Sequence, residues 1–211
     1  SSGFESWQLR TLEMLLGLKS EQRIGGMDPM EHNKKLHSEG KLSDEVMANM
    51  ERIATLPSLY DVLLRWLERT PVNGVSGNKE VMTEFVESHI SSMIEHGETV
   101  IAHMVKIGHG DEETIRPRIT AGIDAAREFL LPSGEVSFSR AGLLFIESYR
   151  ELPLLSWPRR LIDTVVDLEE SMLLFRSHHA RMVERMIGRR MGTGGSSGVD
   201  YLDMTLKYRI F

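Results

Sequence analysis

The sequence of 211 residues contains no cysteine. Without thiols the chain can form neither disulfides nor thiolate-ligated haem, iron–sulfur clusters or covalent haem attachment through C-x-x-C-H. The absence of cysteine also fits a reducing compartment, and we expect a cytoplasmic protein.

Long apolar runs and an excess of positive charge are also missing. No stretch of 18 or more apolar residues is present, so we expect no membrane span, and there is no signal-peptide pattern. A net charge of −6 argues against non-specific binding of nucleic acid, which needs a basic surface. The length and the 41% hydrophobic content suit one globular domain over residues 1–211.

The two ends of the sequence are unusual for a complete chain. Ser1 is not an initiator methionine, and the final residues LKYRIF stop without a polar tail. We therefore expect the chain to be cut from something longer or derived from a processed precursor.

Helical periodicity dominates the sequence, and strand-like alternation is nearly absent. This pattern predicts an all-α domain of roughly eight to ten helices. An internal loop is expected at 71–79, and Pro117 should kink or restart its helix. The predicted helices are 4–18 with a stop at Gly17, 29–37, 44–55 with a cap at Ser43, 59–69 with a capping arrangement of Ser58 and Asp61, 80–107, 111–131, 140–151, a longest helix that follows a Pro-bounded connector at 152–158, and 199–206. Apolar periodicity predicts core positions that include Val62 and Leu67 in 59–69 and Ile94 in 80–107.

Three histidines recur at intervals of seven in one predicted helix, at His89, His96 and His103. This spacing places them on one face but about 10 Å apart per step, which is too far for one metal ion. We interpret them as helix-surface residues.

The longest predicted helix carries an apolar stripe with one histidine in it. Apolar residues fall at steps of four and three, and the sequence of stripe positions is Leu161, Val165, Leu168, Met172, Phe175, His179, Met182 and Met186. Such a stripe predicts a core-facing surface, where an imidazole needs a polar partner. Two interpretations stay open on periodicity alone: a buried histidine bonded to a carbonyl, which the pattern favours, or a metal ligand.

A glycine-rich run, GTGGSSG at 192–198, follows this helix. Gly188 loosens the helix end, and Arg185, Arg189 and Arg190 suit its carboxyl terminus. The run could be a flexible linker, or it could present several backbone N–H groups to one anion. Its position between two apolar-patterned segments and the hydroxyl of Thr193 favour the anion site, although it is not a P-loop.

Several segments together resemble the tryptophan 2,3-dioxygenase family. HARMVERMIG at 179–188 followed by RRMGTGGSSGVDYL at 189–202 resembles the family signature, and SSGFESWQLRTLEMLLG at 1–17 resembles its SSGFQS helix. WLERTP at 66–71 and SFSRAGLLFIESYRELP at 137–153 look like the longer, animal-type members. The resemblance implies an all-α haem-binding bundle of the indoleamine/tryptophan dioxygenase type.

The resemblance implies that His179 is the proximal axial ligand of a haem b iron, because the family ligand lies fourteen residues before the threonine that is Thr193 here. Arg185, Arg189 and Arg190 are then candidate neighbours of the haem propionates. His178 points about 100° away around the helix, so only one of the two histidines can face the haem. The second ring nitrogen of His179 should donate to a partner that fixes its tautomer.

Substrate contacts are also implied by the resemblance. Thr193 and Gly194 would contact the ammonium and carboxylate of the substrate, and Ser2 and Gly3 would line the same pocket. The distal-side residues of the family lie before the position of Ser1. We therefore assign no catalytic residue in this chain and expect the N-terminal half of the domain in cis or as a separate chain.

The sequence departs from the family beside the ligand. Phe175, Ser177 and His178 stand where the family often has Trp, an aromatic residue and Arg or Asn. The loss of an indole N–H donor could alter redox tuning without removing the ligand.

The activity implied by the resemblance is oxidative opening of the indole ring. L-Tryptophan and O₂ would give N-formylkynurenine in tryptophan catabolism, the kynurenine pathway, in a homotetramer. Two alternatives are a related haem oxygenase acting on another aromatic amino acid, and a non-catalytic helical fragment or subunit that binds haem or a partner helix.

Overall fold

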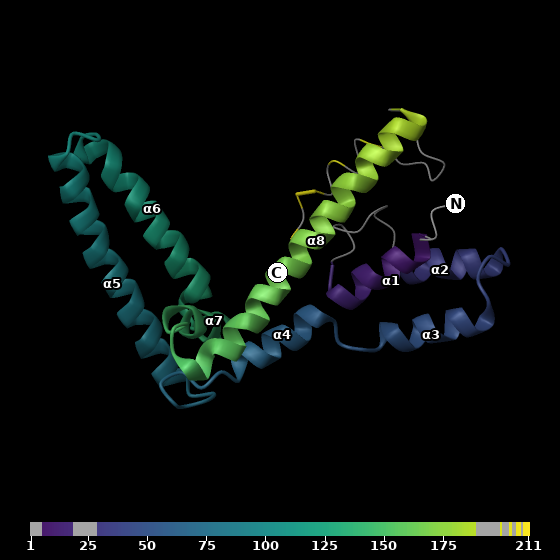
Figure 1. The fold of residues 1–211 in the computed structure, drawn as a ribbon. Coiled ribbons are helices and arrows are strands. Elements are labelled where there is room, and N and C mark those ends of the chain that lie inside the picture. The colour runs from purple at the N-terminus through teal and green to yellow at the C-terminus, as the bar shows by residue number, and fades with distance from the viewer. Residues whose placement is uncertain (1–5, 19–28, 189–198, 200–202, 204–205, 208) are drawn as a thin grey trace. The chain divides into compact units, whose positions relative to one another are not determined.

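The computed structural model describes residues 6–18, 29–188, 199, 203, 206–207 and 209–211 (Figure 1). Among these residues every regular secondary-structure element is a helix, and the one β-type pairing is an isolated bridge between Val72 and Val75. The predicted all-α fold is therefore confirmed. None of the described helices is both long and apolar enough to cross a bilayer.

The chain divides into two compact units. Unit 1 comprises residues 1–63 and 160–211, and unit 2 comprises residues 64–159. Unit 2 is one uninterrupted stretch of chain, whereas unit 1 joins two stretches that are distant in sequence.

Unit 1 begins with three helices that pack on one another: α1 (Ser6–Leu16), α2 (Pro29–Ser38) and α3 (Asp44–Ala54). The predicted stop at Gly17 is confirmed by its φ of +100°, which favours glycine. The side chain of Ser43 caps α3 by accepting the Val46 N–H at 3.3 Å, as the sequence predicts.

Helix α4 (Leu59–Glu68) opens with a reciprocal cap and spans the boundary between the units. The Ser58 N–H and hydroxyl donate to the Asp61 carboxylate, and the Asp61 N–H donates to the Ser58 hydroxyl at 3.2 Å. Leu67 is buried as expected, but Val62 is 48% exposed, so its predicted place in the core is wrong.

Unit 2 is built on a hairpin of two long helices, α5 (Lys79–Lys106) and α6 (Glu112–Leu130), which lie side by side in Figure 1. Helix α6 continues through Pro117, so of the predicted kink or restart the restart is wrong. A 3₁₀ turn (η2, Pro132–Gly134) leads to α7 (Phe138–Ser148). The core of the unit lies where α5, α6 and α7 meet, and its buried members are Val72, Met82, Val86, Ile90, Leu130, Leu131 and Ala141.

Helices α5 and α6 approach one another closely where Gly97 of α5 is buried against α6. A Cβ added to Gly97 would lie 3.0 Å from the Ile119 side chain and 3.2 Å from that of Ile123. Ile94, which the sequence placed in the packing stripe of this helix, is instead 40% exposed. His96 and His103 lie exposed on α5 and His89 is half-buried there, in keeping with a helix-surface interpretation.

The longest helix, α8 (Ser156–Ile187), follows a 3₁₀ turn at Pro153–Leu155 (η3). The sequence predicted a Pro-bounded connector up to Pro158, but the helix already begins at Ser156. Proline is tolerated in a first helical turn, where its missing N–H would have no partner. The predicted last helix at 199–206 falls largely outside the described residues.

Neutralising the carboxylates of Glu98 and Asp111 by substitution is expected to make the α5–α6 hairpin begin to lose helicity at a higher pH during acidification. Hydrogen bonding from Arg116 lowers the pKa of Glu98 from its ordinary value, and hydrogen bonding from Thr114 lowers the pKa of Asp111 in the same way. A lowered pKa means that the folded state binds fewer protons than the unfolded state. The stabilisation is therefore present above the unfolded pKa values and is lost as pH falls through the lowered ones.

The substitutions Glu98→Gln and Asp111→Asn each remove one of these carboxylates together with its pH-dependent contribution to stability. Circular dichroism between pH 6 and pH 2 should show a shallower acid transition for each variant, starting from lower stability at pH 6. Glu84→Gln on the exposed face of α5 serves as the control. Acid transitions with the same slope in all four proteins would contradict the assignment.

Candidate functional site

The apolar stripe of α8 divides into two faces at Met172. One face continues inward through Arg176 and Ala180, which are 2% and 0% exposed. The other face continues outward, and its apolar members are Phe175, Met182 and Met186, which are 37%, 45% and 75% exposed. The prediction that the whole stripe faces the core is therefore wrong for its second half.

The reason for the division is the arrangement of neighbours in unit 1. Leu16 of α1 packs with Met172, and Leu59, Leu168 and Ile210 pack against them. Successive residues are about 100° apart on a helix of 3.6 residues per turn, so Arg176 and Ala180 lie about 40° and 80° from Met172 on one side. Phe175, His179 and Met182 lie about 60°, 20° and 80° from Met172 on the other side. The neighbours in unit 1 cover the side of Arg176 and Ala180, and the other side keeps an exposed apolar surface.

His179 lies on the outward face, half-buried, between these methionines and Phe175. Its ring stacks on the Phe175 ring with the centroids 6.1 Å apart and the planes inclined by 11°. The stacking restricts the imidazole to one side of the helix. His178 is exposed, as its position about 100° away predicts.

Positive charge lies near the end of α8, although only part of the predicted set is described. Arg185 is exposed, and Arg189 and Arg190 fall outside the described residues. Arg181 forms ion pairs with Asp203 and with Glu184, the second at 2.5 Å. The ion pair with Asp203 joins α8 to the segment beyond the glycine-rich run, and hydrogen bonding to Asp203 raises the pKa of Arg181.

The predicted substrate residues Ser2, Gly3, Thr193 and Gly194 fall outside the described residues. The structure does describe the elements that adjoin them. Helix α1 begins at Ser6, and α8 ends at Ile187, directly before Gly188, whose φ of +64° confirms the predicted helix end. Both elements belong to unit 1, which also contains His179.

One polar pair in this unit is not predicted by the sequence pattern. Arg176 of α8 lies 3.6 Å from Glu13 of α1, and both side chains are buried. The signal was available in part, because Arg176 interrupts the row between Met172 and Ala180 and Glu13 interrupts the apolar pattern of α1. Helical periodicity marks each position on its own helix. It does not show that Arg176 and Glu13, which are far apart in the chain, lie next to one another.

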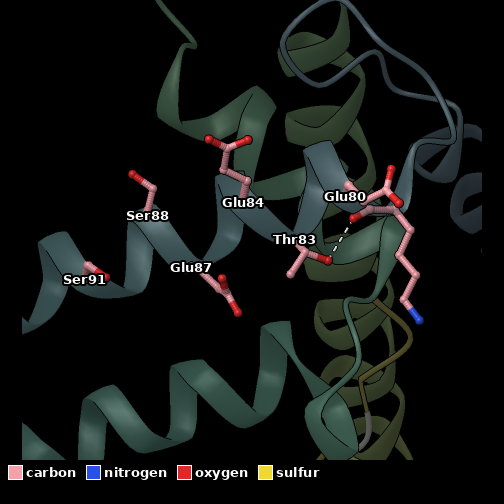
Figure 2. Close-up of a pocket in the computed structure, with 7 residues that line it drawn as sticks. Glu80, Thr83, Glu84, Glu87, Ser88 and Ser91 are labelled. Atoms are coloured by element: carbon pink, nitrogen blue, oxygen red, sulfur yellow. Dashed lines mark hydrogen bonds between the residues drawn. The ribbon is translucent and has the colours of Figure 1, made fainter.

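A shallow groove along α5 offers a different chemistry (Figure 2). Carboxylates and hydroxyls of Glu80, Glu84, Glu87, Ser88 and Ser91 line it, and the Thr83 hydroxyl donates to the Lys79 carbonyl oxygen at 2.8 Å. The groove belongs to unit 2 and contains no histidine. No group of three or more histidine, aspartate or glutamate side chains converges as a metal site among the described residues.

Comparison with known proteins agrees with the resemblance in the sequence. The family described as tryptophan 2,3-dioxygenase matches residues 1–211. A tryptophan 2,3-dioxygenase-like protein of Xanthomonas campestris pv. campestris (strain 8004) is 41% identical over 223 residues, which cover 100% of this chain and 82% of that protein.

Two further relatives are longer. The tryptophan 2,3-dioxygenase of Sorangium cellulosum is 42% identical over all of this chain and 54% of its own length. That of Anopheles gambiae is 34% identical over all of this chain and 55% of its own length. The chain thus spans about half of these two relatives and most of the Xanthomonas protein.

A match over every residue, relatives above 30% identity and an all-helical structure lead to one conclusion. The chain belongs to the tryptophan 2,3-dioxygenase family.

Proposed function

We propose that this chain forms the proximal side of a haem-dependent dioxygenase that converts L-tryptophan and O₂ to N-formylkynurenine. Family membership supports the reaction, and one observation in the structure supports the site. That observation is His179 standing on a partly exposed apolar face of α8, stacked on Phe175.

The described residues fit a haem group. A porphyrin needs an axial imidazole and an apolar surface, and the outward face of α8 provides both. The exposed side chains of Met182 and Met186 are the kind of surface that a bound macrocycle covers. His179 would hold the iron, and Arg185 is a described candidate for pairing with a propionate.

A bound haem would supply the iron chemistry that activates O₂ for oxidative opening of the indole ring. The protein's own contribution is position and exclusion of water. His179 would hold the iron through its imidazole, and Phe175 restricts that ring by stacking. Ser2, Gly3, Thr193 and Gly194 would orient the ammonium and carboxylate of the amino acid.

The remaining features of the proposal come from the family. A cytoplasmic homotetramer is proposed, with the distal side of the pocket supplied by an N-terminal segment in cis or as a separate chain. Apolar exposure on α8 is compatible with such a neighbour, since Met186 on the outward face is 75% exposed.

The test is reconstitution with haemin followed by reduction. We expect a Soret band that shifts on adding L-tryptophan, and formation of N-formylkynurenine carrying two atoms from ¹⁸O₂ when the distal segment is present. Other aromatic amino acids are assayed in parallel. Turnover of one of them in preference to tryptophan, or haem binding without any turnover in the presence of the distal segment, would overturn the proposal.

A further inference from the structure

Two opposite charges are buried together inside unit 1. Glu13 of α1 is 0% exposed and Arg176 of α8 is 2% exposed, and Arg176 Nη2 lies 3.6 Å from Glu13 Oε1. Removing two charges from water is costly, and only a well-placed partner compensates for it. The pair therefore favours one relative position of α1 and α8 at this point.

Arg176 precedes His179 by three residues on the same helix. This separation corresponds to about 4.5 Å along the axis and about 60° around it. Ala180, which directly follows His179, is fully buried on the inward face with Arg176. The helical turn that carries the His179 imidazole is therefore packed into the interior on one side. On its other side, Phe175 and Met182 are partly exposed.

Glu13 links the buried ion pair to helix α1, which directly follows the predicted substrate segment in the chain. Helix α1 begins at Ser6, immediately after the segment that contains Ser2 and Gly3. Leu16, on the same helix, packs with Met172 one turn before Arg176. A displacement of α1 relative to α8 would therefore move the start of α1 and the His179 turn relative to one another.

We propose that Glu13 and Arg176 are a positioning pair that holds the His179 turn of α8 against α1, and so fixes the haem ligand relative to the substrate segment. The haem and substrate consequences rest on the proposed function, whereas the mechanical consequence for α8 does not. Both residues act through the His179 turn, and neither is assigned a contact with the reacting atoms.

A merely structural pair makes a different prediction from a positioning pair. Replacing a buried ion pair by apolar residues of similar volume often restores stability, because the cost of desolvation disappears with the charges. Glu13→Leu combined with Arg176→Met is such a replacement. A structural role predicts that every property recovers with stability, whereas a positioning role predicts that the orientation of the His179 turn does not recover.

The first measurement needs no haem. Hydrogen exchange followed by mass spectrometry is compared in the parent, Arg176→Met, the double variant and Arg176→Lys. We expect a lower Tm for Arg176→Met and a Tm near the parent for the double variant. Amides of residues 173–183 should nevertheless exchange about tenfold faster in the double variant. Glu98→Gln, which removes an exposed ion pair in unit 2, is the control and should leave these amides unchanged.

The second measurement uses the reconstituted protein with its distal segment. The Fe–His stretching band in the resonance Raman spectrum reports the orientation of the imidazole. We expect the band to shift or broaden in the double variant and less so in Arg176→Lys, which keeps the charge. KM for L-tryptophan should rise about tenfold while kcat changes less than about threefold, because α1 orients the substrate segment.

Parent-like exchange at 173–183 in the double variant would overturn the inference, as would a parent-like Fe–His band in that variant. A parent protein that binds no haem would instead overturn the proposed function, and the exchange measurement would still decide the role of the pair.

Discussion

Replacing His179 with alanine is expected to weaken haem binding about 100-fold or more and to abolish turnover. The loss of groups that only support a metal ligand already costs 10- to 100-fold in affinity, and this substitution removes the ligand itself. Because His179 lies half-buried on an otherwise apolar stretch of α8, no described neighbour on that face offers a replacement imidazole. Haem titration followed at the Soret band measures the effect.

His178→Ala is the matched control for this prediction. His178 is the adjacent residue, is exposed and lies about 100° around the helix, so its removal should leave haem binding unchanged. Added imidazole should restore a six-coordinate ferric spectrum in His179→Ala if the cavity left by the side chain is the axial position. Full haem occupancy in His179→Ala, or loss of haem in His178→Ala alone, would refute the ligand assignment.

Gly142→Ala is expected to destabilise unit 2 by about 3 kcal/mol, the upper part of the range for overpacking. Gly142 is buried in α7, and an added Cβ would lie 2.3 Å from the Leu67 carbonyl oxygen and 3.1 Å from the Thr70 Cβ. The first contact involves backbone, so α7 or the end of α4 must move. For a chain of this size the Tm should fall by roughly 6–12 °C, measured by calorimetry.

Gly122→Ala is expected to stabilise the same unit. Gly122 lies in α6 with nothing within 4 Å of an added Cβ, and alanine favours the helix over glycine by about 1 kcal/mol. The variant should therefore raise the Tm. A Gly142→Ala protein as stable as Gly122→Ala would show that α7 and α4 are not as closely packed as described.

Helix ends were the most predictable feature, because the residues that form them act locally. Ser43 and Ser58 cap helices as expected, and Asp111 accepts the Thr114 N–H at 2.8 Å. Gly17 and Gly188 end helices with the positive φ that glycine permits. These interactions need only a few neighbouring residues, so the sequence contains all the necessary information.

The faces of the helices were less predictable. Val62 and Ile94 occupy positions that periodicity assigns to a core, yet both are exposed, while Gly97 is buried. Periodicity identifies an apolar face but does not identify which part of it another helix covers. The same limit applied to the second half of the α8 stripe, where Phe175 and Met182 are partly exposed.

By itself the sequence determined that the chain is helical, where most helices begin and end, and which histidine stands among apolar side chains on the longest helix. The tertiary structure alone decided that His179 lies on a partly exposed face and that Arg176 meets Glu13 in the interior. Caps and periodicity arise from residues within a few positions of one another. Burial and ion pairing between α1 and α8 depend on segments that only the folded chain brings together.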